Sequence, residues 1–181
     1  MNRMNAGMSA HALGQLDVRP TDHVLEIGFG GGVALRSLMP LAACVCGLDR
    51  SQDMVRSIRR RYRAKIAATG GRFLCGSVEQ IPFASASFDR VLSVNTIYFW
   101  RPLEAGVAEI HRVLRPGGRV AIGFLPAEGM APMNMPADIF TLRDAQALSA
   151  VLAAAGFCAI TLRQPRPGVS WRTLVATRPS A

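Results

Sequence analysis

The sequence contains little cysteine and almost no lysine. None of its four cysteines lies in a Cys-x-x-Cys pair or at zinc-ligand spacing from a histidine, so we expect no metal site. Free thiols of this kind suit a reducing compartment. Lys65 is the only lysine, so arginine supplies nearly all of the formal net charge of +9 at pH 7. This charge favours phosphates, nucleic acid or acidic surfaces as partners, but it does not identify one.

Long apolar runs are also missing. No uncharged apolar stretch of the chain reaches membrane-spanning length. Residues 1–16 hold no long apolar stretch and no cleavage site of the secretory type. The sequence therefore predicts a soluble, cytoplasmic protein without a membrane span, and it leaves the oligomeric state open.

What the sequence does have is an ordinary globular composition. Half of its 181 residues are hydrophobic and 18% are charged, which carries no signature of disorder. A chain of this length can bury a core without disulfides or metals. We therefore predict a single domain over residues 1–181, with a helical cover over residues 1–20 and an α/β core over residues 21–181.

Short β-like runs alternate with helical patterns along the core, which is typical of a doubly wound α/β sheet. Ser51 is a good N-cap for a helix that we expect to continue to Ala68, and Pro102 suits the first turn of another. Thr141 with Asp144 resembles a capping box for a further helix. Strands are expected at residues 23–28, 44–49, 72–75, 88–95, 119–125, 159–162 and 171–176. We predict a Rossmann-like, seven-stranded, mostly parallel sheet, in which a short connection makes the last strand antiparallel to its neighbour.

The strongest functional signal is the glycine-rich turn Glu26-Ile27-Gly28-Phe29-Gly30-Gly31-Gly32. Glycines between a strand and a helix let the backbone turn tightly and approach a ligand closely. Asp49 follows about twenty residues later, where a carboxylate can accept hydrogen bonds from both ribose hydroxyls of an adenosine. The Glu26 carboxylate at the crevice suits a cationic ligand, and Val33 replaces the third glycine of the dinucleotide fingerprint. The pattern therefore favours an adenosyl sulfonium over NAD.

Four segments, in order and at the right spacing, resemble the class I S-adenosylmethionine-dependent methyltransferases. They correspond to motif I, to the acidic ribose loop, to the family's "E-x-L-P-F … S-F-D-x-V" segment and to its "E-x-x-R-V-L-K-P-G-G" run, and they lie at residues 24–32, 47–51, 79–91 and 109–118. The resemblance points in particular to the branch that contains quinone-biosynthesis and other small-molecule methyltransferases. It implies S-adenosylmethionine as the cofactor and in-line methyl transfer to a small-molecule acceptor, for which an apolar or aromatic compound is one option.

The resemblance also implies which residues bind the cofactor. Gly28 and Gly30 would flank its methionine part, Glu26 would lie near its amino group, and Asn95 would lie near the methionyl end. Asp49 would hold the ribose. The remaining three would lie around the adenine, and they are Arg50, Ser77 and Val78. The family usually has aspartate where this chain has Ser77, so an uncharged acceptor would face the adenine amino group and bind it less strongly.

The sequence contains no obvious general base, which methyl transfer needs only if the acceptor must lose a proton. Tyr98 and His11 are weak catalytic candidates, and packing is the alternative role for Tyr98. His111 is expected at the surface. Thr96, Tyr98 and Trp100 would shape an apolar or aromatic acceptor pocket or belong to the core.

Other functions stay open at this point. An RNA or other nucleic-acid methyltransferase would account for the arginine-rich helix, but the chain reads Asn95-Thr96-Ile97-Tyr98 where enzymes acting on exocyclic base amines have Asn-Pro-Pro-aromatic. A non-catalytic module that binds S-adenosylmethionine would account for the altered Ser77. A nicotinamide oxidoreductase is the weakest alternative, because the Tyr-x-x-x-Lys pair of short-chain reductases is missing.

Overall fold

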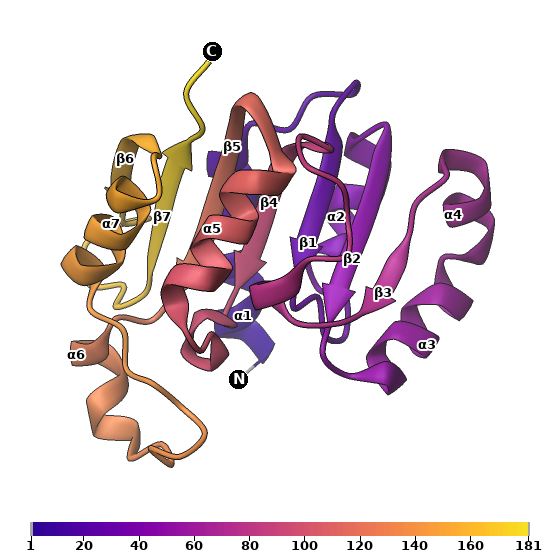
Figure 1. The fold of residues 1–181 in the computed structure, drawn as a ribbon. Helices are drawn as coiled ribbons and strands as arrows, with labels where there is room; N and C mark the ends of the chain where they lie inside the picture. The colour runs from indigo at the N-terminus through magenta and orange to yellow at the C-terminus, as the bar shows by residue number, and fades with distance from the viewer. Residues whose placement is uncertain (1, 181) are drawn as a thin grey trace.

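The computed structural model describes residues 2–180, and its centre is a twisted sheet with helices on both faces (Figure 1). The strands are β1 (His23–Ile27), β2 (Cys44–Asp49), β3 (Phe73–Cys75), β4 (Phe88–Val94), β5 (Leu114–Phe124), β6 (Cys158–Arg163) and β7 (Arg172–Thr177). The helices are α1 (Asn2–Leu16), α2 (Leu35–Leu41), α3 (Gln52–Arg61), α4 (Arg63–Thr69), α5 (Leu103–Val113), α6 (Ala127–Met130) and α7 (Ala145–Ala154). Three short 3-10 turns complete the set, namely η1 (Val78–Gln80), η2 (Ile97–Phe99) and η3 (Ala131–Met133). None of the helices in the described part of the chain is long and apolar enough to cross a membrane.

The strands lie in the order β3-β2-β1-β4-β5-β7-β6. Strands β1 to β5 pair in parallel, whereas β7 runs antiparallel to both β5 and β6. The predicted Rossmann-like class, the seven strands and the antiparallel last strand are therefore confirmed. The chain reverses its direction of travel across the sheet between β1 and β4, and ligands of open α/β sheets bind at such switch points.

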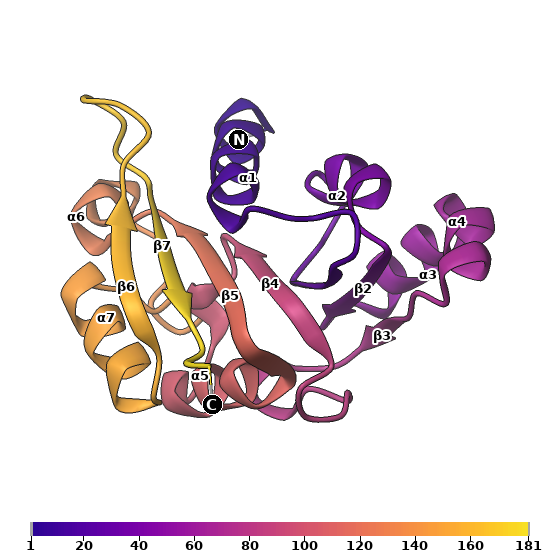
Figure 2. The same ribbon diagram turned by 90° about the horizontal axis from the view of Figure 1, so that it is seen from above.

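The central strands of the sheet are buried on both faces, which explains their apolar runs. All of β1 except its first residue is buried. Figure 2 shows α1 and α2 on one side of the sheet and α5 and α7 on the other. The buried side chains divide accordingly into two clusters, one around Leu35 and Ile58 and one around Ile110 and Leu148.

Helix α1 lies across β4, β5 and β7 (Figure 2). Met8, Ala12 and Leu16, spaced one turn apart, are fully buried against the sheet. The approach is close at Gly123 of β5, where a Cβ atom would lie 3.1 Å from Met8 Cγ. The amino-terminal segment is thus packed as part of the domain.

Two predictions about helices were wrong, and β5 begins five residues before the strand expected at residues 119–125. The helix expected from Ser51 to Ala68 is interrupted at Tyr62, whose φ and ψ are −108° and 20°. Helix α3 buries two side chains, whereas α4 buries none. Because α4 has no buried side chain to anchor it to the sheet, packing does not force it to continue along the axis of α3. Asp144, and not Thr141, caps α7, because its Oδ1 accepts the backbone N–H groups of Gln146 and Ala147, both at 2.8 Å. The Thr141 hydroxyl instead accepts from Arg101 Nε at 3.0 Å.

Candidate functional site

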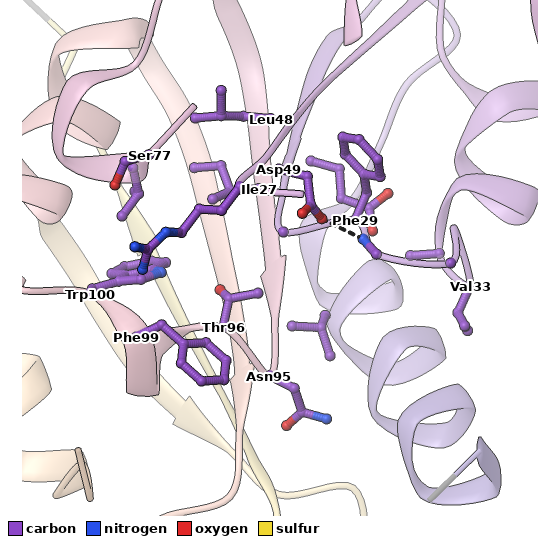
Figure 3. Close-up of a pocket in the computed structure, with 18 of the residues that line it drawn as sticks. Ile27, Phe29, Val33, Leu48, Asp49, Ser77, Asn95, Thr96, Phe99 and Trp100 are labelled. Atoms are coloured by element: carbon purple, nitrogen blue, oxygen red, sulfur yellow. Dashed lines mark hydrogen bonds between the residues drawn. The ribbon is translucent and has the colours of Figure 1, made fainter. Parts of the chain in front are cut away.

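A cavity of about 360 Å³ opens at the carboxyl ends of β1, β2 and β4 (Figure 3). Its walls come from the glycine-rich turn, the ends of these strands, the turn after β3, helix α1 and η2. The volume falls in the range of about 300–1,000 Å³ that is usual for small-molecule sites. All eight residues predicted to bind the cofactor line this one cavity, and they are Glu26, Gly28, Gly30, Asp49, Arg50, Ser77, Val78 and Asn95.

The glycine-rich turn has little room for side chains at its base. Gly28 has a φ of 70°, and a Cβ atom there would clash with the side chain of Thr96. Gly30, with a φ of 47°, has open space where its side chain would be. A left-handed turn without Cβ atoms therefore leaves backbone exposed to whatever fills the cavity.

Asp49 connects this turn to the second strand (Figure 3). Its Oδ2 accepts the N–H of Gly30 at 2.7 Å, and its Oδ1 accepts the N–H of Ser51 at 2.9 Å. A carboxylate has about four lone-pair directions, so it can accept further hydrogen bonds from a ligand. Asp49 therefore fixes the shape of the turn and can still bind hydroxyl groups.

Glu26 lines the cavity and is 5% exposed. Its Oε2 is a buried oxygen that has no hydrogen-bond partner within residues 2–180. Burial, together with the nearby charge of Asp49, raises the pKa of Glu26 to about 8. Burying a carboxyl group without a hydrogen-bond partner destabilises the folded protein, and a cationic ligand group that pairs with it would remove this penalty.

Ser77 and Glu79 form the end of the cavity that η1 provides. The Ser77 hydroxyl donates to Glu79 Oε2, and Glu79 Oε1 accepts the backbone N–H of Arg101 at 2.7 Å. Val78 between them is buried, and Arg50 also lines this end. Our prediction from the sequence did not include Glu79. Its position two residues after Ser77 could have indicated that the two side chains lie close together.

Asn95, Asn5 and Ser9 form the other side of the cavity. Asn95 has a φ of 58°, a left-handed conformation that asparagine tolerates better than most residues. Its Nδ2 donates to Asn5 Oδ1 of α1 at 2.8 Å. Our prediction missed Asn5 and Ser9, because no pattern in α1 marks a binding face. Phe99 and Trp100 of the η2 segment also line the cavity.

The weak catalytic candidates lie elsewhere. Tyr98 is buried and does not line the cavity. Its hydroxyl accepts the N–H of Leu125 at 2.6 Å and donates to Asn95 Oδ1 at 3.3 Å, and burial raises its pKa to about 12. His11 lies against β7, with its Nδ1 2.9 Å from Thr173 Oγ1, and burial lowers its pKa. Neither residue is among those that line the cavity. His111, expected at the surface, is half-buried with its ring against that of Phe157.

Comparison with known proteins gives a consistent assignment. Residues 25–122 match a family model described as a methyltransferase domain. The uncharacterized methyltransferase YdaC of Bacillus subtilis is 33% identical over 129 residues, which cover 70% of this chain and 69% of YdaC. The demethylmenaquinone methyltransferase of Beutenbergia cavernae is 33% identical over 122 residues, which cover 67% of this chain but 48% of that protein.

Solved structures share the fold. A phosphoethanolamine N-methyltransferase of Haemonchus contortus, in complex with S-adenosyl-L-methionine, superposes with a TM-score of 0.78 at 17% sequence identity. The superposition covers 96% of this chain and 53% of the other. This chain thus spans about half the length of several proteins that it resembles.

Proposed function

The chain belongs to the class I S-adenosylmethionine-dependent methyltransferases, and from this premise we propose that it transfers the methyl group to a small-molecule acceptor. S-adenosylmethionine is the methyl donor of this family. The observation that carries the proposal is that Glu26, Asp49 and Ser77 line one cavity, to which α1 and η2 also contribute residues. Donor and acceptor would meet in that cavity.

The residues present fit the donor. The unpartnered Oε2 of Glu26 matches the ammonium group of its methionine part, and Asp49 matches the ribose hydroxyls. Ser77 and Val78 match the adenine, and Asn95 would lie near the methionyl end. When bound, S-adenosylmethionine supplies a methyl group that its sulfonium has already activated.

The protein's contribution to the reaction would be positioning. In-line displacement needs the two reactants close together and aligned, and a preformed cavity provides much of the required acceleration. Tyr98 does not line the cavity, and its pKa is raised to about 12 by burial, so its hydroxyl is unsuited to act as a base near neutral pH. We therefore assign no general base.

Apolar rings in the cavity wall favour a small acceptor with apolar or aromatic character. Phe99, Trp100 and Val94 line the cavity near Asn95. A relative with similar sequence is named for demethylmenaquinone, a small molecule. The arginines of α3 give less support to RNA, because Arg59 and Arg61 donate to the carbonyl groups of Phe73 and Gly31 within the chain.

Calorimetric titration tests the proposed cofactor site. S-adenosylmethionine and S-adenosylhomocysteine should bind and NADH should not. Asp49→Ala should weaken binding by about 1.5–3 kcal/mol, equivalent to about ten- to a hundredfold. Asp53→Ala, on the exposed face of α3, is the matched control and should leave affinity unchanged. Failure of both adenosyl ligands to bind the folded protein would contradict the proposed site.

Transfer of a labelled methyl group tests the acceptor. A panel of naphthoquinols, phenols and fatty acids is compared with total RNA, each incubated with labelled S-adenosylmethionine and the wild-type protein. Label is expected in at least one of the small molecules. Label in RNA alone would overturn the small-molecule proposal and leave the cofactor site intact.

A further inference from the structure

The turn after β3 places a serine and a glutamate together at one end of the cavity. Ser77 precedes η1 with an extended backbone, and Figure 3 shows it at the opposite end of the cavity from Val33. The next residue, Val78, is buried against α5, where a Cβ atom on Gly106 would lie 3.1 Å from Val78 Cγ1. This tight packing fixes the position of the turn and therefore of Ser77.

Both carboxylate oxygens of Glu79 are engaged. Oε1 accepts the backbone N–H of Arg101 at 2.7 Å, and Oε2 accepts the hydroxyl hydrogen of Ser77. The Arg101 guanidinium is itself held by the carbonyl of Asp138 at 2.9 Å and by Thr141 Oγ1 at 3.0 Å. Glu79 is therefore fixed from two sides and determines where the Ser77 proton points.

A serine hydroxyl has one hydrogen to donate and two lone pairs with which to accept. Since Glu79 takes the hydrogen, Ser77 can offer only lone pairs to a ligand in the cavity. A hydrogen bond to a carboxylate also polarises the hydroxyl and strengthens it as an acceptor. The exocyclic amino group of adenine is a donor and matches this arrangement, whereas the oxo group of hypoxanthine is an acceptor and does not.

We propose that Glu79 is a specificity-determining residue that acts through Ser77, and that the pair selects an amino group at position 6 of the purine. It supplies, from two residues along the chain, the negative charge that an aspartate at position 77 would have provided. The inference rests on the proposed cofactor site and adds to it the residue that reads the base. Glu79 is a positioning residue, because it contacts the ligand only through the hydroxyl that it orients.

The test compares binding of S-adenosylhomocysteine with that of S-inosylhomocysteine, which has an oxo group at position 6 and a hydrogen on N1. The change at N1 is the same for every variant, so a difference in preference between variants reports the contact at position 6. The wild-type protein should prefer the adenine ligand by at least about tenfold, since a polar site left unpaired rejects an analogue. Glu79→Gln keeps an oxygen for Arg101 but can donate its amide N–H to Ser77, which frees the hydroxyl to donate to the oxo group. The preference should then fall by at least about fivefold.

Three further variants make the result specific. Ser77→Ala leaves the bond between Glu79 and Arg101 in place and should lose the same preference. Ser77→Asp in the Glu79→Gln background should restore it, because the charged acceptor is then present at position 77. Glu104→Gln removes an exposed carboxylate outside the cavity and should behave as wild type.

The outcomes separate this inference from the proposed function. A Glu79→Gln protein that folds, binds S-adenosylhomocysteine and keeps the wild-type preference would overturn the role of Glu79 alone. The same conclusion follows if Ser77→Ala keeps the preference. A wild-type protein that binds neither ligand would overturn the cofactor site itself, and the inference with it.

Discussion

At the scale of single residues, Glu26 has the most unusual environment in the cavity. Its pKa is raised to about 8 by burial and by Asp49, compared with an ordinary value of 4.5. Between these two pH values the folded protein holds a proton that the unfolded chain releases. The free energy of unfolding therefore falls as pH rises through this interval.

Glu26→Gln should remove that pH dependence. The variant should match or exceed the wild type in stability at pH 9, because no carboxylate is forced to ionise in a buried place. The same change should weaken binding of S-adenosylmethionine, since the ammonium group favours the ionised carboxylate and an amide cannot ionise. Denaturant unfolding without ligand, at pH 6 and pH 9, measures the first effect. An equal loss of stability between these pH values in both proteins would contradict this explanation.

A second residue-scale feature joins two of the segments that carry the family resemblance. Glu109 Oε2 accepts the N–H of Ile81 at 2.7 Å, and Arg112 donates to the carbonyls of Ile81 and Phe83, both at 2.9 Å. These residues therefore hold a loop against α5 and do not reach the cavity. Part of the sequence signature thus reports the fold and not the chemistry.

Acid titration should reveal the contribution of Glu109 to stability. Hydrogen bonds from Arg112, acting against partial burial, lower the pKa of Glu109. The stability that it contributes is present above its ordinary pKa of 4.5 and is lost as pH falls through the lowered value. Glu109→Gln should therefore be less stable than wild type at pH 7, by about 1 kcal/mol. The difference should close in strong acid, and a constant difference at all pH values would argue against the ionic contribution.

At the scale of elements, α1 connects the sheet to the cavity. Met8 is fully buried under it, while Asn5 and Ser9 on the same helix line the cavity. Met8→Ala should lower the free energy of unfolding by about 2–5 kcal/mol, as for other buried truncations. It should also weaken S-adenosylhomocysteine binding, because a loosened helix no longer holds Asn5 against Asn95.

Gly14→Ala on the same helix should stabilise the protein, in contrast to Met8→Ala. Gly14 is exposed, and a Cβ atom there would contact nothing within 4 Å. Alanine in a helix interior is favoured over glycine by about 0.5–1 kcal/mol. The variant should unfold at higher denaturant concentration than wild type and bind ligand equally well. Lower stability would mean that α1 is not helical at this position.

The elements also show how much of the fold and of the cavity could be predicted from the sequence. Strands and glycine turns follow from local patterns, so their positions and the cavity residues contributed by them were predicted. The roles of Tyr98 and Phe99 were harder to predict. A 3-10 turn rotates about 120° per residue, so a shift of one residue along the chain changes which of the two rings enters the core. Tyr98 is buried, and Phe99 lines the cavity. The contributions of Asn5 and Ser9 depend on tertiary packing of α1, which leaves no local mark.

At the scale of the whole molecule, the net charge of +9 is the dominant property. Such a protein attracts any polyanion, and non-specific affinities are about 10⁻⁴–10⁻⁶ M at physiological salt. We expect binding to RNA and to heparin with similar affinity and with a steep decrease as salt rises. Filter binding over a salt series measures both. Tight binding that favours RNA over heparin at high salt would instead support a nucleic-acid substrate.

The packing of α1 also has a consequence for synthesis of the chain. His11 in α1 lies against Thr173 in β7, a residue 162 positions later in the sequence. Translation delivers α1 before every strand of the sheet, but the surface that it covers is complete only after β7 has left the ribosome. Until then the nascent chain carries an incomplete sheet face beneath α1, and the cavity wall formed by Asn5 and Ser9 is not fully supported.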